Sequence, residues 1–153
     1  MKFFRSASLL CLISSSASAF VAPRPHLSTR VRLILQAAPG VEVANPDDVK
    51  KALANDNTII IDARGLDEIQ KSGYFKPTKP SQQWLNIPCS ITEAPLLTMA
   101  AEDMLRDKST PIIVHCASGK RSTLAKKVLD DMGYENVLNA GGFPGDMEPF
   151  MEK

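Results

Sequence analysis

Two short, unbroken apolar runs constrain the fold of this 153-residue chain more than any other feature. The first is the β-branched run Thr58–Ile61, and the second is Pro111–His115. Neither run alternates apolar with polar residues, so each predicts a strand that is buried on both faces. Strands of this kind occur in parallel sheets whose two faces are covered by helices.

Helical patterns separate these strands along the chain. Asn45 and Pro46 have the residue types of an N-cap and a first helical position, and they predict a helix that ends near Ala54. The other expected elements are helices over 66–71, 98–107 and 118–132, short strands over 85–88 and 136–139, and a loop over 72–83. This alternation of strands and helices predicts a single α/β domain.

Charge is divided unevenly along the chain. Residues 1–40 hold five basic residues and no acidic one, whereas residues 41–153 hold 13 basic and 17 acidic residues, a net charge of −4. An acidic body lacks the basic surface typical of nucleic-acid-binding proteins. No run of about eighteen apolar residues is present that could span a membrane. Three cysteines are too few for a disulfide scaffold, and with only two histidines beside them we expect no metal and no organic cofactor.

The first forty residues have the pattern of a targeting sequence. Two basic residues, a short apolar stretch and small residues ending at Ala19 follow the order of a secretory signal peptide over 1–19. Residues 20–40 are basic and free of acidic residues, as in an organelle transit peptide. With Phe20 directly after the cleavage point, the join resembles the bipartite presequence of algae with plastids of secondary origin. We therefore expect a plastid location, with secretion as the alternative, and a mature domain over 41–153 that is not attached to a membrane.

Cys116 ends the second buried run, at the place where parallel sheets bind their ligands. A loop and a helix follow it, so backbone amides and the positive end of that helix can surround the sulfur. Lys120 and Arg121 add full positive charges, and Gly119 lets the backbone approach a ligand closely. The amides, the helix end and the two cations each favour thiolate over thiol, so we predict a pKa for Cys116 below about 8.5. A buried cysteine can also be no more than a small apolar residue, but the whole pattern favours chemistry.

Some neighbouring residues allow two interpretations. His115 precedes the nucleophile in a strand, so it points to the opposite face, and we expect a hydrogen-bonded structural histidine rather than a general base. Cys89 is either a resolving thiol or, as we favour, an inert half-buried cysteine. Three aromatic residues either line an opening or, as we favour, pack beneath a loop: Tyr74, Phe75 and Trp84.

Several stretches together resemble a rhodanese domain from about Val41 to the C-terminus. They are Ile59–Arg64, Leu85–Ser90, the loop Cys116–Arg121 and Asn139–Phe143. The resemblance implies an α/β fold with a five-stranded parallel sheet and helices on both faces. It also implies that Cys116 is a nucleophile that takes a sulfane sulfur from a donor such as thiosulfate, holds it as a persulfide and passes it to cyanide or a thiol.

The resemblance further implies roles for single residues. Those expected to bind the substrate and stabilise the persulfide are Ala117, Ser118, Gly119, Lys120, Arg121 and Ser122. Asp62 and Arg64 match an Asp-x-Arg element of the family, and we expect a buried polar pair that supports the architecture. The implied partners are a small anionic sulfur donor and a thiol, cyanide or a thiol-carrying protein as acceptor. Residues 71–85 depart from the glycine-histidine and Gly-Ala elements of the family, which leaves the shape of the site's rim open.

Two other classes of function remain as alternatives. Cysteine-dependent phosphatases and arsenate reductases share the His-Cys strand end and the arginine, but they place five residues between the cysteine and the arginine. This chain has four, and the shorter loop encloses a space that suits a sulfur atom better than a phosphate group. The other alternative is a non-catalytic sulfur carrier or docking module, because a thiol is needed for carriage as well as for turnover.

Overall fold

The computed structural model of the protein describes residues 40–151. Its elements are α2 (Pro46–Leu53), β1 (Ile59–Asp62), α3 (Leu66–Ser72), β2 (Gln83–Asn86), α4 (Pro95–Met104), β3 (Ile112–Cys116), α5 (Lys120–Asp131), β4 (Val137–Gly142) and the 3-10 helix η2 (Glu148–Phe150). The signal peptide expected at 1–19, and the transit segment expected at 20–40 apart from Gly40, lie outside the described residues. Among the described helices, none has the length and apolar character needed to cross a membrane.

Local capping explains where the helices begin. The side chain of Asn45 accepts a hydrogen bond from the amide of Asp47 at 2.9 Å, so the predicted N-cap of α2 is confirmed. The helix expected at 98–107 instead spans 95–104, because Pro95 takes the first helical position and Leu105 leaves helical geometry.

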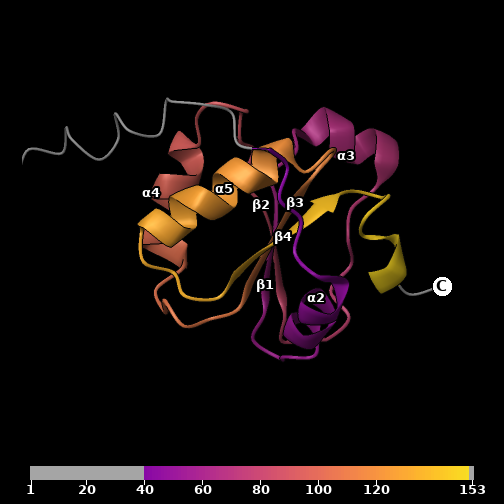
Figure 1. The fold of residues 1–153 in the computed structure, drawn as a ribbon, viewed down its shortest axis with the longest axis horizontal. Coiled ribbons are helices and arrows are strands. Elements are labelled where there is room, and N and C mark those ends of the chain that lie inside the picture. The colour runs from indigo at the N-terminus through magenta and orange to yellow at the C-terminus, as the bar shows by residue number, and fades with distance from the viewer. Residues whose placement is uncertain (1–39, 152–153) are drawn as a thin grey trace, which may run out of the picture. The chain divides into compact units, whose positions relative to one another are not determined.

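The four strands form one parallel sheet in the order β2-β1-β3-β4 (Figure 1). The expectation of five strands is therefore wrong for residues 40–151. Residues 41–44 do reach β4, where the amide of Ala44 donates to the carbonyl of Asn139 at 2.7 Å. The carbonyl of Glu42, however, accepts from the Asn139 side chain at 2.6 Å. Because a side chain replaces a backbone partner there, no fifth strand ladder forms.

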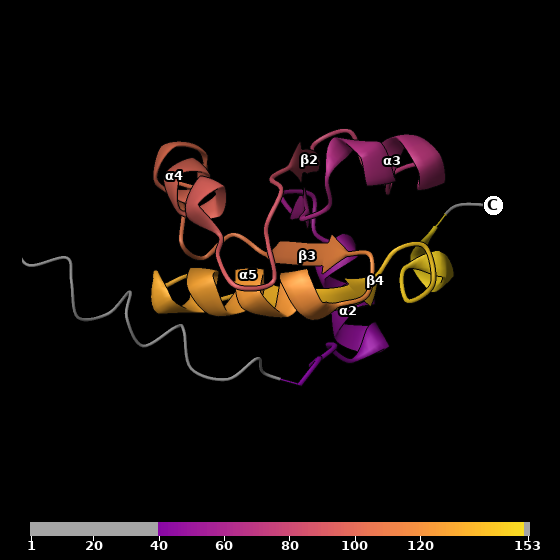
Figure 2. The ribbon, with the colours of Figure 1, turned by 90° about the horizontal axis from the view of Figure 1, so that it is seen from above.

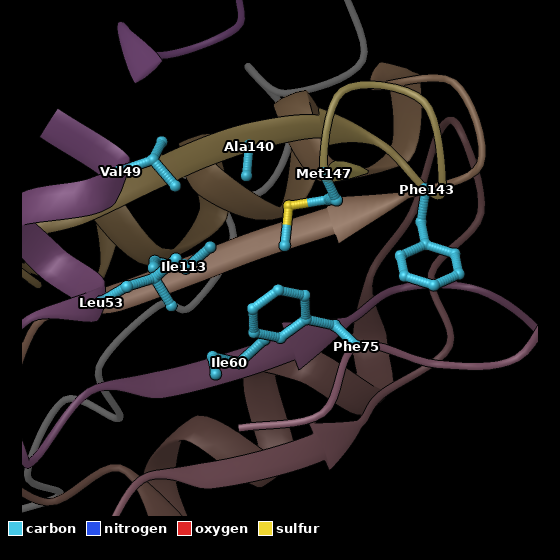
Figure 3. Close-up of a cluster of buried hydrophobic side chains, with 8 residues drawn as sticks. All are labelled: Val49, Leu53, Ile60, Phe75, Ile113, Ala140, Phe143 and Met147. Atoms are coloured by element: carbon cyan, nitrogen blue, oxygen red, sulfur yellow. The ribbon is translucent and has the colours of Figure 1, made fainter. Parts of the chain in front are cut away.

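Helices cover both faces of this sheet. α5 packs against β3 and β4, and α4 lies beside α5 (Figures 1 and 2). α2 packs on the other face, where its apolar side chains join a buried cluster from three strands and two loops (Figure 3). The cluster consists of Val49, Leu53, Ile60, Phe75, Ile113, Ala140, Phe143 and Met147. Every residue of β1 and β3 is buried, which confirms that the two apolar runs are strands covered on both faces.

Candidate active site at the carboxyl end of β3

The predicted loop residues lie together where β3 gives way to α5. Cys116 is the last residue of the strand, residues 117–119 form the turn, and Lys120 is the first residue of the helix. Gly119 has a φ of 81°, and a Cβ at this position would come within 2.6 Å of the Val41 side chain. A larger residue would be strained in its backbone and would also clash, so the tight turn depends on glycine.

The sulfur of Cys116 is surrounded by hydrogen-bond donors. The residue is buried, and burial, the largest single influence, raises the pKa of its thiol. Hydrogen bonds act in the opposite direction: the Ser122 hydroxyl lies 3.6 Å from the sulfur, and the amides of Ser118, Ser122 and Arg121 also donate to it. Together these bonds outweigh burial and bring the pKa of Cys116 below its ordinary value.

Arg121 is paired with a carboxylate that the sequence analysis missed. Its Nη1 and Nη2 atoms donate to the two carboxylate oxygens of Glu68, each at 2.6 Å. These bonds are the main reason why the pKa of Glu68 falls to about 2, and they raise the pKa of Arg121. Glu68 also accepts from the amide of Gly65 at 3.0 Å, which fixes it at the start of α3. The only sequence feature that could have indicated Glu68 as a partner is its place as an acidic residue in the first turn of the helix that follows the neighbouring buried strand.

Asp62 and Arg64 lie at the carboxyl end of β1, beside β3. The Nε and Nη2 atoms of Arg64 donate to the Asp62 carboxylate at 2.9 and 2.6 Å. Arg64 also donates to the Ser72 hydroxyl at 2.7 Å and to the Gly73 carbonyl at 2.8 Å. Its guanidinium carbon lies 4.4 Å from the ring centre of Phe143. The pair therefore ties the end of β1 to the end of α3 and to the core.

A family model of the rhodanese-like domain matches residues 45–146 of this chain. The match covers more than half of the chain and includes the sheet and the Cys116 loop. The chain belongs to the rhodanese-like family.

Three known proteins are similar to this chain in sequence or in fold. Thiosulfate sulfurtransferase PspE of Escherichia coli K12 is 36% identical over 58 residues, which cover 38% of this chain and 51% of that protein. A Schizosaccharomyces pombe protein, provisionally named a mitochondrial thiosulfate sulfurtransferase, is 31% identical over 99 residues, 61% of this chain and 65% of its own length. The chain thus spans about half to two thirds of these relatives. The solved polysulfide-sulfur transferase homodimer of Wolinella succinogenes has a TM-score of 0.53 and 24% identity over 79% of this chain and 81% of that one, a likeness of fold.

His115 of this rhodanese domain is buried beside Phe143, with ring centres 5.6 Å apart. Among the described residues neither ring nitrogen has a hydrogen-bond partner, and Nε2 lies 3.8 Å from the Asp62 carboxylate. The expectation of a hydrogen-bonded histidine is therefore wrong. Burial lowers the pKa of His115 to about 4, so the ring is neutral at pH 7.

Cys89 and Phe75 are packed into the rhodanese domain, whereas Tyr74 is exposed. Cys89 is a free, buried thiol whose pKa burial raises to about 11, as expected of an inert cysteine. Phe75 belongs to the core cluster, as expected, but the expectation that Tyr74 packs beneath a loop is wrong, because Tyr74 is 45% exposed. It lies against the half-buried Trp84 with ring centres 5.0 Å apart and ring planes tilted by 47°. Within residues 40–151, no three His, Cys, Asp or Glu side chains form a group that could hold a metal ion.

Proposed function

We propose that this rhodanese domain is a sulfurtransferase that works through a persulfide on Cys116. The observation that carries the proposal is the set of hydrogen bonds on its sulfur, from the Ser122 hydroxyl and three backbone amides. Such donors favour a reactive thiolate. They also favour the anionic persulfide that a transferred sulfur would leave in the same place. The sulfurtransferase names of two relatives support the same class of reaction.

In the proposed reaction the Cys116 thiolate attacks the outer sulfur of thiosulfate. The S–S bond of the donor breaks, and its electron pair leaves with sulfite, so Cys116 gains one sulfur atom as a persulfide. Cyanide or a thiolate then attacks the terminal sulfur. Thiocyanate or a new persulfide leaves, and the Cys116 thiolate is restored without any external oxidant or reductant.

The donor is proposed to be a small anion held by the loop of residues 117–122. Backbone amides and the N-terminus of α5 suit an anion. Glu68 accepts one N–H from each terminal nitrogen of Arg121, so we assign that side chain to holding the loop in place, with its other N–H groups available to the anion. The acceptor is proposed to be cyanide, a small thiol or a thiol-carrying protein.

Mass spectrometry of the full chain after exposure to thiosulfate tests the persulfide step. We expect a gain of about 32 Da, one sulfur atom, on the peptide that contains Cys116, and no gain in Cys116→Ser. Cys89→Ser is the matched control, and it should still gain the sulfur. The Cys116 side chain is 0% exposed, and burial alone slows electrophiles. Absence of the gain, together with slow alkylation of Cys116 in mild base, would contradict the proposal.

Steady-state kinetics separate turnover from carriage. Continuous formation of thiocyanate from thiosulfate and cyanide, lost in Cys116→Ser, is the expected result for an enzyme. Loading of one sulfur without turnover would instead identify a carrier. Cleavage of an aryl phosphate without any sulfur transfer would identify the phosphatase class.

We also propose that residues 1–40 direct the protein to a plastid. The proposal rests on the order of the basic, apolar and small residues and on Phe20 after Ala19. Residues 1–40 fused to a fluorescent protein should reach the plastid of an alga with a secondary plastid. Phe20→Ala should hold the fusion outside the plastid stroma, and export of the unchanged fusion from the cell would support secretion instead.

A further inference from the structure

Several hydrogen-bond donors approach the carbonyl oxygen of Gly119, in the loop that follows Cys116. It accepts from the amide of Thr123 at 2.9 Å and from the Thr123 hydroxyl at 2.8 Å. The Ser122 hydroxyl lies 3.0 Å from the same carbonyl and 3.6 Å from the sulfur. A serine hydroxyl has one proton to donate, so it can serve either the carbonyl or the sulfur.

Asn139 in β4 sets the direction of this network. Its Oδ1 accepts from the amide of Gly141 at 2.9 Å, which fixes the orientation of the side-chain amide. Its Nδ2 therefore donates, to the Glu42 carbonyl at 2.6 Å and to the Thr123 hydroxyl oxygen at 2.9 Å. The same Nδ2 lies 3.4 Å from the Gly119 carbonyl, a much longer contact. Because the Thr123 oxygen accepts from Asn139, the Thr123 proton is directed at Gly119.

We propose that Thr123, oriented by Asn139, is a positioning residue for Cys116. The amide and hydroxyl of Thr123 fill the two lone pairs of the Gly119 carbonyl and leave the Ser122 proton to the sulfur. The inference rests on the proposed function, since it concerns the same thiol. Asn139 is 1% exposed and Thr123 9%, so the network is largely shielded from competing water.

The titratable groups around the sulfur keep their charges in this scheme. They are Arg121 and Glu68, which are paired with each other, the exposed Lys120 at the start of α5, and Cys89 and His115, which are neutral at pH 7. Replacing Thr123 by an uncharged residue alters none of them. A change in the Cys116 pKa would therefore report on hydrogen bonding to the sulfur.

Thr123→Val removes the hydroxyl and keeps the shape of the side chain. On the full chain, the rate of alkylation by iodoacetamide against pH should show the Cys116 pKa raised by about one unit, because the Ser122 proton returns to Gly119. Thr123→Ser should restore the wild-type value. Thr98→Val is the matched control, because Thr98 makes the same kind of bond to a carbonyl four residues earlier in α4, at 3.3 Å, and it should leave the pKa unchanged.

The variant Ser122→Ala tests whether the effect of Thr123 on Cys116 depends on the Ser122 proton. It should raise the Cys116 pKa by about one unit, and adding Thr123→Val should raise it no further, because the proton in question is already absent. Thr123→Ala, which also lacks the hydroxyl, takes the place of Thr123→Val if circular dichroism shows that the valine variant is unfolded. A wild-type Cys116 pKa in Thr123→Val or Thr123→Ala, or additive shifts in the double variant, would overturn this inference without affecting the proposed function. An ordinary pKa of about 8.5 in the wild-type protein would instead remove the basis of the proposed function.

Discussion

Two arginine–carboxylate pairs lie at the carboxyl end of the sheet, and they differ mainly in burial. The shortest N–O distance is 2.6 Å in both, but Arg64 and Asp62 are 1% and 0% exposed, whereas Arg121 and Glu68 are 20% and 33% exposed. Buried charges must stay paired, because leaving a buried charge without its partner greatly lowers the stability of the fold. Charges in contact with water lose little when they are separated. The Arg64–Asp62 pair, here called the inner pair, therefore supports the architecture. The Arg121–Glu68 pair, here called the outer pair, holds the loop that carries Cys116 and can be separated at little cost in stability.

The largest expected effect comes from breaking the inner pair. Arg64→Leu leaves the Asp62 charge buried without its partner, and it should lower the free energy of unfolding by about 3–5 kcal/mol, measured by urea denaturation of the full chain. The double variant Asp62→Leu with Arg64→Leu removes both charges and should be less destabilised than the single one. A loss below about 1 kcal/mol in Arg64→Leu would show that the inner pair behaves like the outer one.

The second effect comes from His115, which lies beside the inner pair. Its pKa is about 4 in the folded protein and about 6.5 when unfolded, so between these values the unfolded chain binds more protons. Stability should therefore fall by about 2–3 kcal/mol as the pH drops from 6.5 to 4. His115→Phe should flatten this part of the curve in urea denaturation at pH 7, 5.5 and 4. An unchanged slope in the variant would assign the acid sensitivity to other groups.

The third effect concerns the outer pair and the thiol. Arg121→Ala removes a cation near the sulfur and frees the Glu68 carboxylate, so the Cys116 pKa should rise by about one unit while the fold persists. Glu68→Gln leaves Arg121 unpaired and should lower the same pKa. Alkylation rates against pH measure both variants. Equal values in the two variants would mean that the outer pair does not act on the sulfur.

The smallest expected effect is on stability. Glu68→Gln should lower the free energy of unfolding by less than about 1 kcal/mol, because the pair is partly exposed. The folded pKa of Glu68 is depressed to about 2 from 4.5, so its contribution is complete above pH 4.5 and is lost as the pH falls toward 2. Urea denaturation at pH 6 and pH 2.5 should show the difference between the wild type and the variant shrinking. A difference that grows in acid would contradict this assignment.

Local features of the sequence predict much of the fold and part of the site. The strands β1 and β3 and the cap of α2 at Asn45 are confirmed, because each depends on residues that are near neighbours in the chain. The same reasoning places Cys116 at the end of β3, directly before the loop and α5. The local patterns also indicate four strands, as observed, whereas the fifth strand that the family resemblance implied is absent from residues 40–151, where the Asn139 side chain takes the place of a backbone partner.

The sequence by itself thus determined the strand–loop–helix unit that carries the cysteine, because burial pattern, glycine geometry and capping act over a few residues. Only the tertiary structure decided what surrounds that unit. Glu68 and Arg121 are 53 residues apart, and Asn139 reaches a carbonyl 97 residues away. Such contacts form only when packing of the sheet brings distant segments together, and the resulting burial decides which charges are fixed and which can respond to the sulfur.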